Sequence, residues 1–145
     1  MNSMISPFQM KKNRVVSFEF RQNETVGEYE ERKVSFGVDY EIADIVESDG
    51  IMRTELHLLI QIKGRADTEE ELFQLRLDMM GVFEGDSEQI DRERFLTMLK
   101  INGLSTLMQL SRAYVTASTA LSGFVNPIHF PMVNVYELVK MKEKE

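Results

Sequence analysis

Alternation of apolar and polar residues marks four segments in the first half of the chain, at residues 16–21, 34–42, 55–62 and 73–79. In the first segment, Val16, Phe18 and Phe20 are separated by single polar residues. A period of two predicts a strand that has one apolar and one polar face. The strands are connected only by segments rich in turn-forming residues, at 23–27, 48–50 and 64–68. We therefore predict a four-stranded antiparallel sheet arranged as a meander.

Helical periodicity replaces the alternation in the second half of the chain. Ser87 predicts the N-cap of a short helix that ends near Lys100, where Asn102 and Gly103 break or bend the chain. A longer helix is predicted at residues 104–122.

An irregular crossover that contains two prolines follows at residues 123–133. Asn134, with Glu137 three residues later, then predicts the start of a final helix at 135–142. The whole chain, residues 1–145, thus predicts a single α+β domain in which a four-stranded antiparallel sheet is followed by a long helix and a short C-terminal helix.

The long helix carries more apolar surface than one sheet can cover. Its apolar positions, with serines between them, span an arc of about 200°, whereas a helix that rests on one sheet buries about 100°. Leaving the second stripe exposed would forgo about 1.5–3 kcal/mol for each large side chain. We therefore expect a homo-oligomer, a dimer or a tetramer, in which a second helix approaches Ser111, Val115 and Ser118.

Composition narrows the classes of function. The 145 residues include 24 Asp and Glu against 17 Lys and Arg, and the net charge of −7 has the wrong sign for binding nucleic acid. Cysteine is absent, so thiolate metal sites are excluded, and we expect neither a metal nor another cofactor. No segment resembles a membrane span or a secretory signal, so we expect a cytoplasmic protein without membrane insertion.

The sequence offers no catalytic constellation. His57 shares the polar face of a strand with Glu55, but an exposed surface histidine is the simpler interpretation. His129 lies among apolar residues and is interpreted as structural. Because neither a nucleophile elbow nor a phosphate-binding glycine loop occurs, we expect no enzyme activity.

Four short motifs follow one another along these elements. They are Val16-Ser17-Phe18-Glu19, Gly81-Val82-Phe83, Leu107-Met108 with Arg112 and Val115-Thr116, and the segment 131–138. In this order they resemble SecB, the bacterial protein-export chaperone. The resemblance implies a bacterial protein that binds non-native or extended polypeptides, for example during protein export. Gln109 and Leu110 stand where SecB has a proline and a tyrosine, and a divergent SecB-like family of unassigned function fits this departure equally.

Two surfaces are candidates for binding. The crossover residues Phe124, Val125, Ile128, Phe130 and Met132 either seal the core or, as the resemblance implies, line a groove for unfolded polypeptide. Three further methionines would suit such a groove, namely Met79, Met80 and Met108.

The second candidate is the polar face of the sheet. It carries Glu19, Asp39, Glu41, Glu55, Asp78 and Arg76. This face is interpreted either as an ordinary wetted surface or as a docking site for a basic partner. In SecB this face binds the ATPase SecA, but Arg76 stands where SecB has an acidic residue, so we expect weak or no binding to SecA. An adaptor or structural protein that binds one specific partner remains the alternative function.

Overall fold

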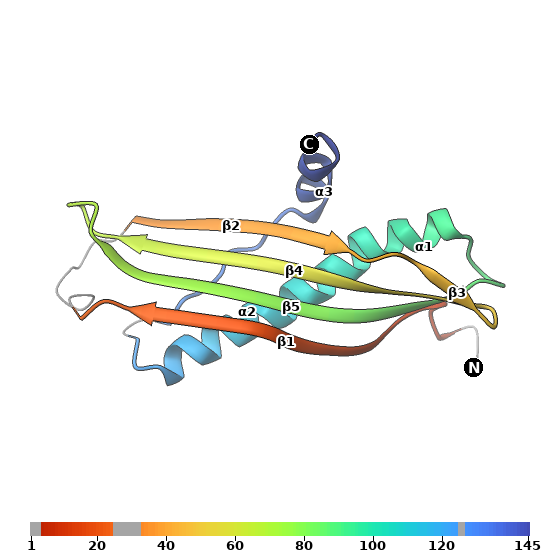
Figure 1. Cartoon of the computed structure of the whole chain (residues 1–145), viewed down its shortest axis with the longest axis horizontal. Helices are drawn as coiled ribbons and strands as arrows, with labels where there is room; N and C mark the ends of the chain where they lie inside the picture. The colour runs from red at the N-terminus through yellow and green to blue at the C-terminus, as the bar shows by residue number, and fades with distance from the viewer. Residues whose placement is uncertain (1–3, 25–32, 125–126) are drawn as a thin grey trace.

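Long antiparallel strands form the body of the protein (Figure 1). The computed structural model describes residues 4–24, 33–124 and 127–145. The strands are β1 (Phe8–Gln22), β2 (Lys33–Ile42), β3 (Val46–Ser48), β4 (Ile51–Arg65) and β5 (Glu71–Asp86). All of them pair antiparallel, and the helices lie together on one face of the sheet. The predicted α+β fold, with an antiparallel sheet followed by a long and a short helix, is confirmed, and β3 is a short addition to it.

The strand order is β1-β5-β4-β2, with β3 paired to the start of β4, so the predicted meander is wrong. β5 pairs with β4 on one side and with β1 on the other. Pairing with β5 places Phe18 and Phe20 of β1 beside Leu77 and Leu75, which continues the apolar face of the sheet. As a result β1 and β2, which are consecutive strands among the described residues, occupy opposite edges.

The apolar face of β1 differs from the predicted one by a single residue. Its register shifts between Met10 and Lys12 and again between Val15 and Ser17. Val15 therefore packs against the core, whereas Val16 is 43% exposed. A β-bulge changes which side chains face inward, and alternation alone does not reveal it.

Phenylalanine rings fill the space above glycines on the helix-covered face. A Cβ added to Gly64 would lie 2.0 Å from Cε1 of Phe73, and one added to Gly85 would lie 2.5 Å from Cδ1 of Phe95. Glycine in a strand commonly marks such a close approach. The main core therefore rests directly on the sheet backbone. It contains residues of β4 and β5, the long helix and the crossover.

One helix runs from Arg92 to Leu121 in three parts: α1 (Arg92–Met98), the π-helical segment η3 (Leu99–Gly103) and α2 (Leu104–Leu121). Its N-cap is Asp91, whose side chain accepts a hydrogen bond from the Arg94 amide, rather than Ser87 as predicted. The predicted break near Gly103 is a widened helical turn instead. Phe95 of α1 belongs to a small second core with Met52 and Ile90, while α2 packs on the main core.

The crossover and α3 (Val135–Glu143) complete the helical side of the molecule. Asn134 caps α3 by accepting a hydrogen bond from the Glu137 amide, which confirms the predicted helix start. Among the described residues, no helix is long and apolar enough to cross a membrane.

Candidate functional site

The outer edge of β2 is the clearest candidate for binding another chain. β2 lies at one edge of the sheet, and no strand among the described residues pairs with its outer side. Its pairing with β4 runs without a register shift from Lys33 to Ile42. Val34 and Phe36, on the helix-covered face, are each 42% exposed, and Phe36 meets the buried ring of Phe130 with centroids 5.4 Å apart. We call Val34 and Phe36 the edge strip.

Helix α3 limits the open part of this edge. Nζ of Lys142 lies 2.9 Å from Oδ1 of Asp39 and 5.6 Å from the ring centroid of Tyr40, which is buried. The hydrogen bond from Lys142 lowers the pKa of Asp39 and raises that of Lys142, while burial raises the pKa of Tyr40. A second ion pair joins Nζ of Lys100 to Oε1 of Glu143 at 3.0 Å and holds the end of α3. The exposed apolar stretch of β2 therefore ends before Tyr40.

The crossover seals the core more than it lines a groove. Phe124, Ile128 and Phe130 are buried, with the Phe124 and Phe73 rings 4.9 Å apart, whereas Met132 is 85% exposed. Val125 lies outside the described residues. Of the two interpretations of this segment, burial supports the core-sealing one for the first three residues.

The predicted set of groove methionines does not share one site. Met79 and Met108 are buried in the main core. Met80 follows Met79 directly in β5, and successive strand side chains point to opposite faces, so Met80 lies on the helix-free face. A single groove lined by Met79, Met80 and Met108 is therefore excluded.

Polar side chains of α2 hold the crossover in place. Nε of Arg112 donates to the Phe130 carbonyl at 2.9 Å, and the Thr116 hydroxyl donates to the Ile128 carbonyl at 3.1 Å. The buried Thr119 hydroxyl accepts from the Ile128 amide at 3.0 Å. The crossover is thus held along the flank of α2 that carries Arg112, Thr116 and Thr119.

The exposure of Ser111, Val115 and Ser118 bears on the predicted subunit contact. Ser111 and Val115 are fully buried within the subunit, and Ser118 is partly buried. The two buried side chains are not accessible to a second copy, so their assignment to a subunit contact is corrected. The exposed residues of α2 are instead Gln109, Ala113, Ala117 and Ala120, with Leu121 at its C-terminal end.

All six residues predicted on the polar face lie on the helix-free face of the sheet. The face is not strongly acidic, because the longer strands add cations that the predicted segments omitted, namely Arg14, Arg53 and Lys63. Several carboxylates are already paired: Glu19 with Arg21, Asp39 with Lys142, and Glu84 with Arg53. Attraction of a basic partner by this face is correspondingly weaker than the sequence implied.

A shallow hollow of about 520 Å³ lies in the middle of this face. Leu59, an apolar residue on the otherwise polar side of β4, lines this hollow, and so does Gly37, which has no side chain to fill it. Nδ1 of His57 lies 2.9 Å from Oδ1 of Asp78, and Nε2 lies 3.7 Å from Glu55. His57 thus lies between two carboxylates, whereas His129, predicted to be structural, is exposed.

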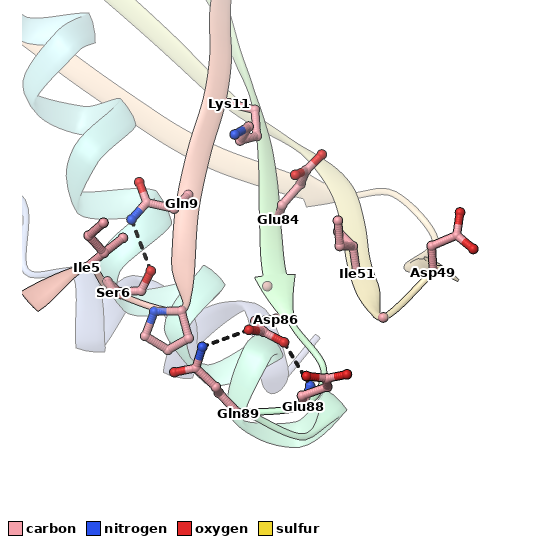
Figure 2. A pocket seen from close by; sticks show the side chains of 13 residues that line it. Ile5, Ser6, Gln9, Lys11, Asp49, Ile51, Glu84, Asp86, Glu88 and Gln89 are labelled. Carbon is pink, nitrogen blue, oxygen red and sulfur yellow. Dashed lines mark hydrogen bonds between the residues drawn. The ribbon is translucent and has the colours of Figure 1, made fainter. Parts of the chain in front are cut away.

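A second hollow, of about 510 Å³, lies at the end of the sheet next to the N-terminal segment (Figure 2). Asp86 accepts hydrogen bonds there from the Glu88 amide and from Nε2 of Gln89. The lining includes four carboxylates and one cation, Lys11, but among the described residues no group of three or more His, Asp or Glu is placed to hold a metal ion.

Comparison with known proteins finds similar structures but no match in sequence. No protein-family model matches the chain, and no curated protein matches its sequence. Among solved structures, the SecB-like chaperone Rv1957 of Mycobacterium tuberculosis, in complex with a ChAD peptide from the HigA1 antitoxin Rv1956, superposes with a TM-score of 0.60. The match covers 88% of this chain and 91% of that one at 12% identity. The fold is SecB-like.

A protein of unknown function from Streptococcus agalactiae has a similar structure. It matches 86% of this chain and 97% of its own at 10% identity, with a TM-score of 0.50. At these identities the likeness concerns the SecB-like fold alone.

Proposed function

We propose that this chain is a SecB-like chaperone that binds extended or non-native polypeptides along the outer edge of β2. One observation carries the proposal: β2 is an unbroken edge strand, no strand among the described residues pairs with its outer side, and the half-exposed edge strip lies along it. Strand addition combines both features, because backbone hydrogen bonds give affinity and alternate side chains fill apolar sites. The peptide held by the SecB-like chaperone of Mycobacterium tuberculosis supports the same class of function.

The proposed site also predicts the form of a bound segment. It would lie extended along residues 33–38 and place alternate apolar side chains against Val34 and Phe36. Burial of apolar surface drives this contact, so micromolar-range binding should depend little on salt.

The test compares two matched pairs of substitutions. Val34→Ser with Phe36→Ser removes the edge strip, whereas Val46→Ser with Ile51→Ser removes a valine and an isoleucine that are 63% and 43% exposed elsewhere in the sheet. We expect the first variant to lose suppression of aggregation for several unrelated denatured proteins. The second variant should behave like the wild type. Equal activity of both variants would reject β2 as the site.

A specific adaptor is the second candidate function, because the bound peptide of the structural neighbour comes from one antitoxin. Pull-down from lysate separates the two functions. A chaperone should capture many proteins in variable amounts, whereas an adaptor should capture one partner at constant stoichiometry.

SecA binding and self-association remain predictions within this proposal. Because Arg76 replaces an acidic residue of SecB, Arg76→Glu should strengthen any measurable SecA binding at low salt. For self-association we propose the exposed side of α2 around Ala113 and Ala117 as the contact. Light scattering that shows a stable monomer at micromolar concentration would reject the oligomer.

A further inference from the structure

Helix α1 has far fewer contacts with the rest of the molecule than α2. Of its seven residues only Phe95 is buried, whereas α2 buries six of its eighteen. Side chains of α2 also bond to the crossover. In the part of the chain that the structure describes, the side-chain hydrogen bonds of residues 91–98 stay within that segment, and these residues form no ion pair. Little therefore has to break when α1 leaves the sheet.

One aromatic ring anchors α1. Phe95 lies so close over Gly85 that a Cβ added to this glycine would be 2.5 Å from Cδ1 of the ring. The ring packs with Met52 of β4 and with Ile90 of the loop before α1, and its centroid is 5.7 Å from that of Phe8. The second core thus depends on a single buried side chain of α1.

The segments on both sides of α1 are fixed without its help. Before the helix, the Asp86 amide donates to the Pro7 carbonyl and the Ser87 amide to the Gly50 carbonyl, each at 3.0 Å. After it, Leu99 of η3 is buried in the main core. The π-helical turn therefore lies where the second core ends and the main core begins, and such irregular turns within a helix often mark hinges.

We infer that α1 is a flap: residues 90–98 move off the sheet as a unit and uncover Met52, while the strands, η3 and the main core stay folded. Local opening has a smaller free energy than global unfolding where few buried contacts are lost. The open form exposes apolar side chains that the closed form hides. The inference involves neither the edge strip nor the polypeptide proposed to bind there, so each can fail without the other.

Buried methionines in the two cores provide the test. Met52 in the second core is 1% exposed, and Met79 and Met108 in the main core are 3% and 4% exposed. Peroxide oxidises methionine to the sulfoxide. A buried methionine reacts when the structure opens around it, so we expect Met52 of the wild type to react at least about tenfold faster than the other two. Mass spectrometry of peptides measures each rate relative to that of the same methionine in the urea-unfolded chain.

Two matched substitutions locate the boundary of the flap. Phe95→Leu and Phe73→Leu each shorten a buried ring that lies over a strand glycine, the first in the second core and the second in the main core. Global unfolding includes opening of the flap, so Phe95→Leu should speed oxidation of all three methionines by about tenfold. Phe73→Leu should speed that of Met79 and Met108 alone. Circular dichroism checks that both variants fold.

Three results would overturn the inference. Equal oxidation rates of the three methionines in the wild type would show one cooperative unit. A Phe73→Leu protein in which Met52 gains as much as Met79 would show the same. The third result concerns the Phe95 amide, which donates to the Asp91 carbonyl at 2.9 Å. If Met52 reacts fast while this amide stays protected from hydrogen exchange, the opening belongs to another segment than α1.

Discussion

The two faces of the sheet show how differently one set of strands can be used. The helix-covered face is buried beneath closely packed side chains, with Phe73 lying over Gly64 and Phe95 over Gly85. The helix-free face has alternating charges, ion pairs and a hollow that Leu59 helps to line. Stability therefore depends mainly on one face, which leaves the other free to vary in chemistry.

Adjacent positions of β5 provide the strongest test of this difference. Phe73→Ala removes a buried ring that contacts Phe20 and Phe124, and we expect a loss of about 3–5 kcal/mol in the free energy of unfolding. Gln74→Ala, one residue along on the other face, should change it by no more than about 0.5 kcal/mol. Urea titration measures both. Similar losses in the free energy of unfolding would contradict the conclusion that stability depends mainly on the helix-covered face.

Two strand glycines should respond with opposite sign to the same substitution. Gly64→Ala forces the Phe73 ring to move, at a cost of about 1–3 kcal/mol. At Gly37, on the helix-free face, an added Cβ meets its nearest atom at 3.8 Å, in Gln61. Gly37→Ala should therefore stabilise the protein by about 0.5–1 kcal/mol, through the lower backbone entropy of the unfolded chain. A destabilised Gly37→Ala protein would show that this position has a structural requirement for glycine.

On the helix-covered face, removal of two buried hydroxyls should change stability in opposite directions. The Ser111 hydroxyl has no hydrogen-bond partner among the described residues, so Ser111→Ala should raise stability by about 1 kcal/mol. Thr119→Val should lower stability by about 1–3 kcal/mol, because the Ile128 amide loses its acceptor. Thermal unfolding monitored by circular dichroism compares them. Equal destabilisation by the two substitutions would mean that Ser111 also has a bonding role.

The smallest expected effect belongs to the exposed pair between Asp39 and Lys142. The pKa of Asp39 is lowered in the folded protein from its ordinary value of 3.8 by the hydrogen bond from Lys142. Stability from this pair is therefore present above the unfolded value and lost as pH falls through the folded one. Asp39→Asn should flatten the fall in melting temperature below about pH 5. Glu41→Gln, on the same face, is the control and should change this slope less.

The sequence was informative where the physical signal is local. Alternation located the strands, and Asn134 located the start of α3. The sequence did not predict the features that depend on contacts between distant segments. Nothing local to Val16 reveals the register shift that puts Val15 in the core, and nothing in residues 16–42 shows that β1 and β2 lie on opposite edges. The edge strip was missed for the same reason, since Phe36 appears as an ordinary core residue until β2 is known to be outermost.

The π-helical segment η3 has a consequence for how the chain tolerates insertions and deletions. Successive residues of an α-helix turn by about 100°, so one residue gained or lost between α1 and α2 rotates α1 by that angle about its own axis. The wide turn at Leu99–Gly103 sets the phase that points Phe95 at Gly85 and Leu107 at the main core. A one-residue deletion there would leave a smoother helix while turning Phe95 away from Gly85. The irregular turn thus sets the rotation of α1 relative to α2 that lets one continuous helix pack against two separate cores.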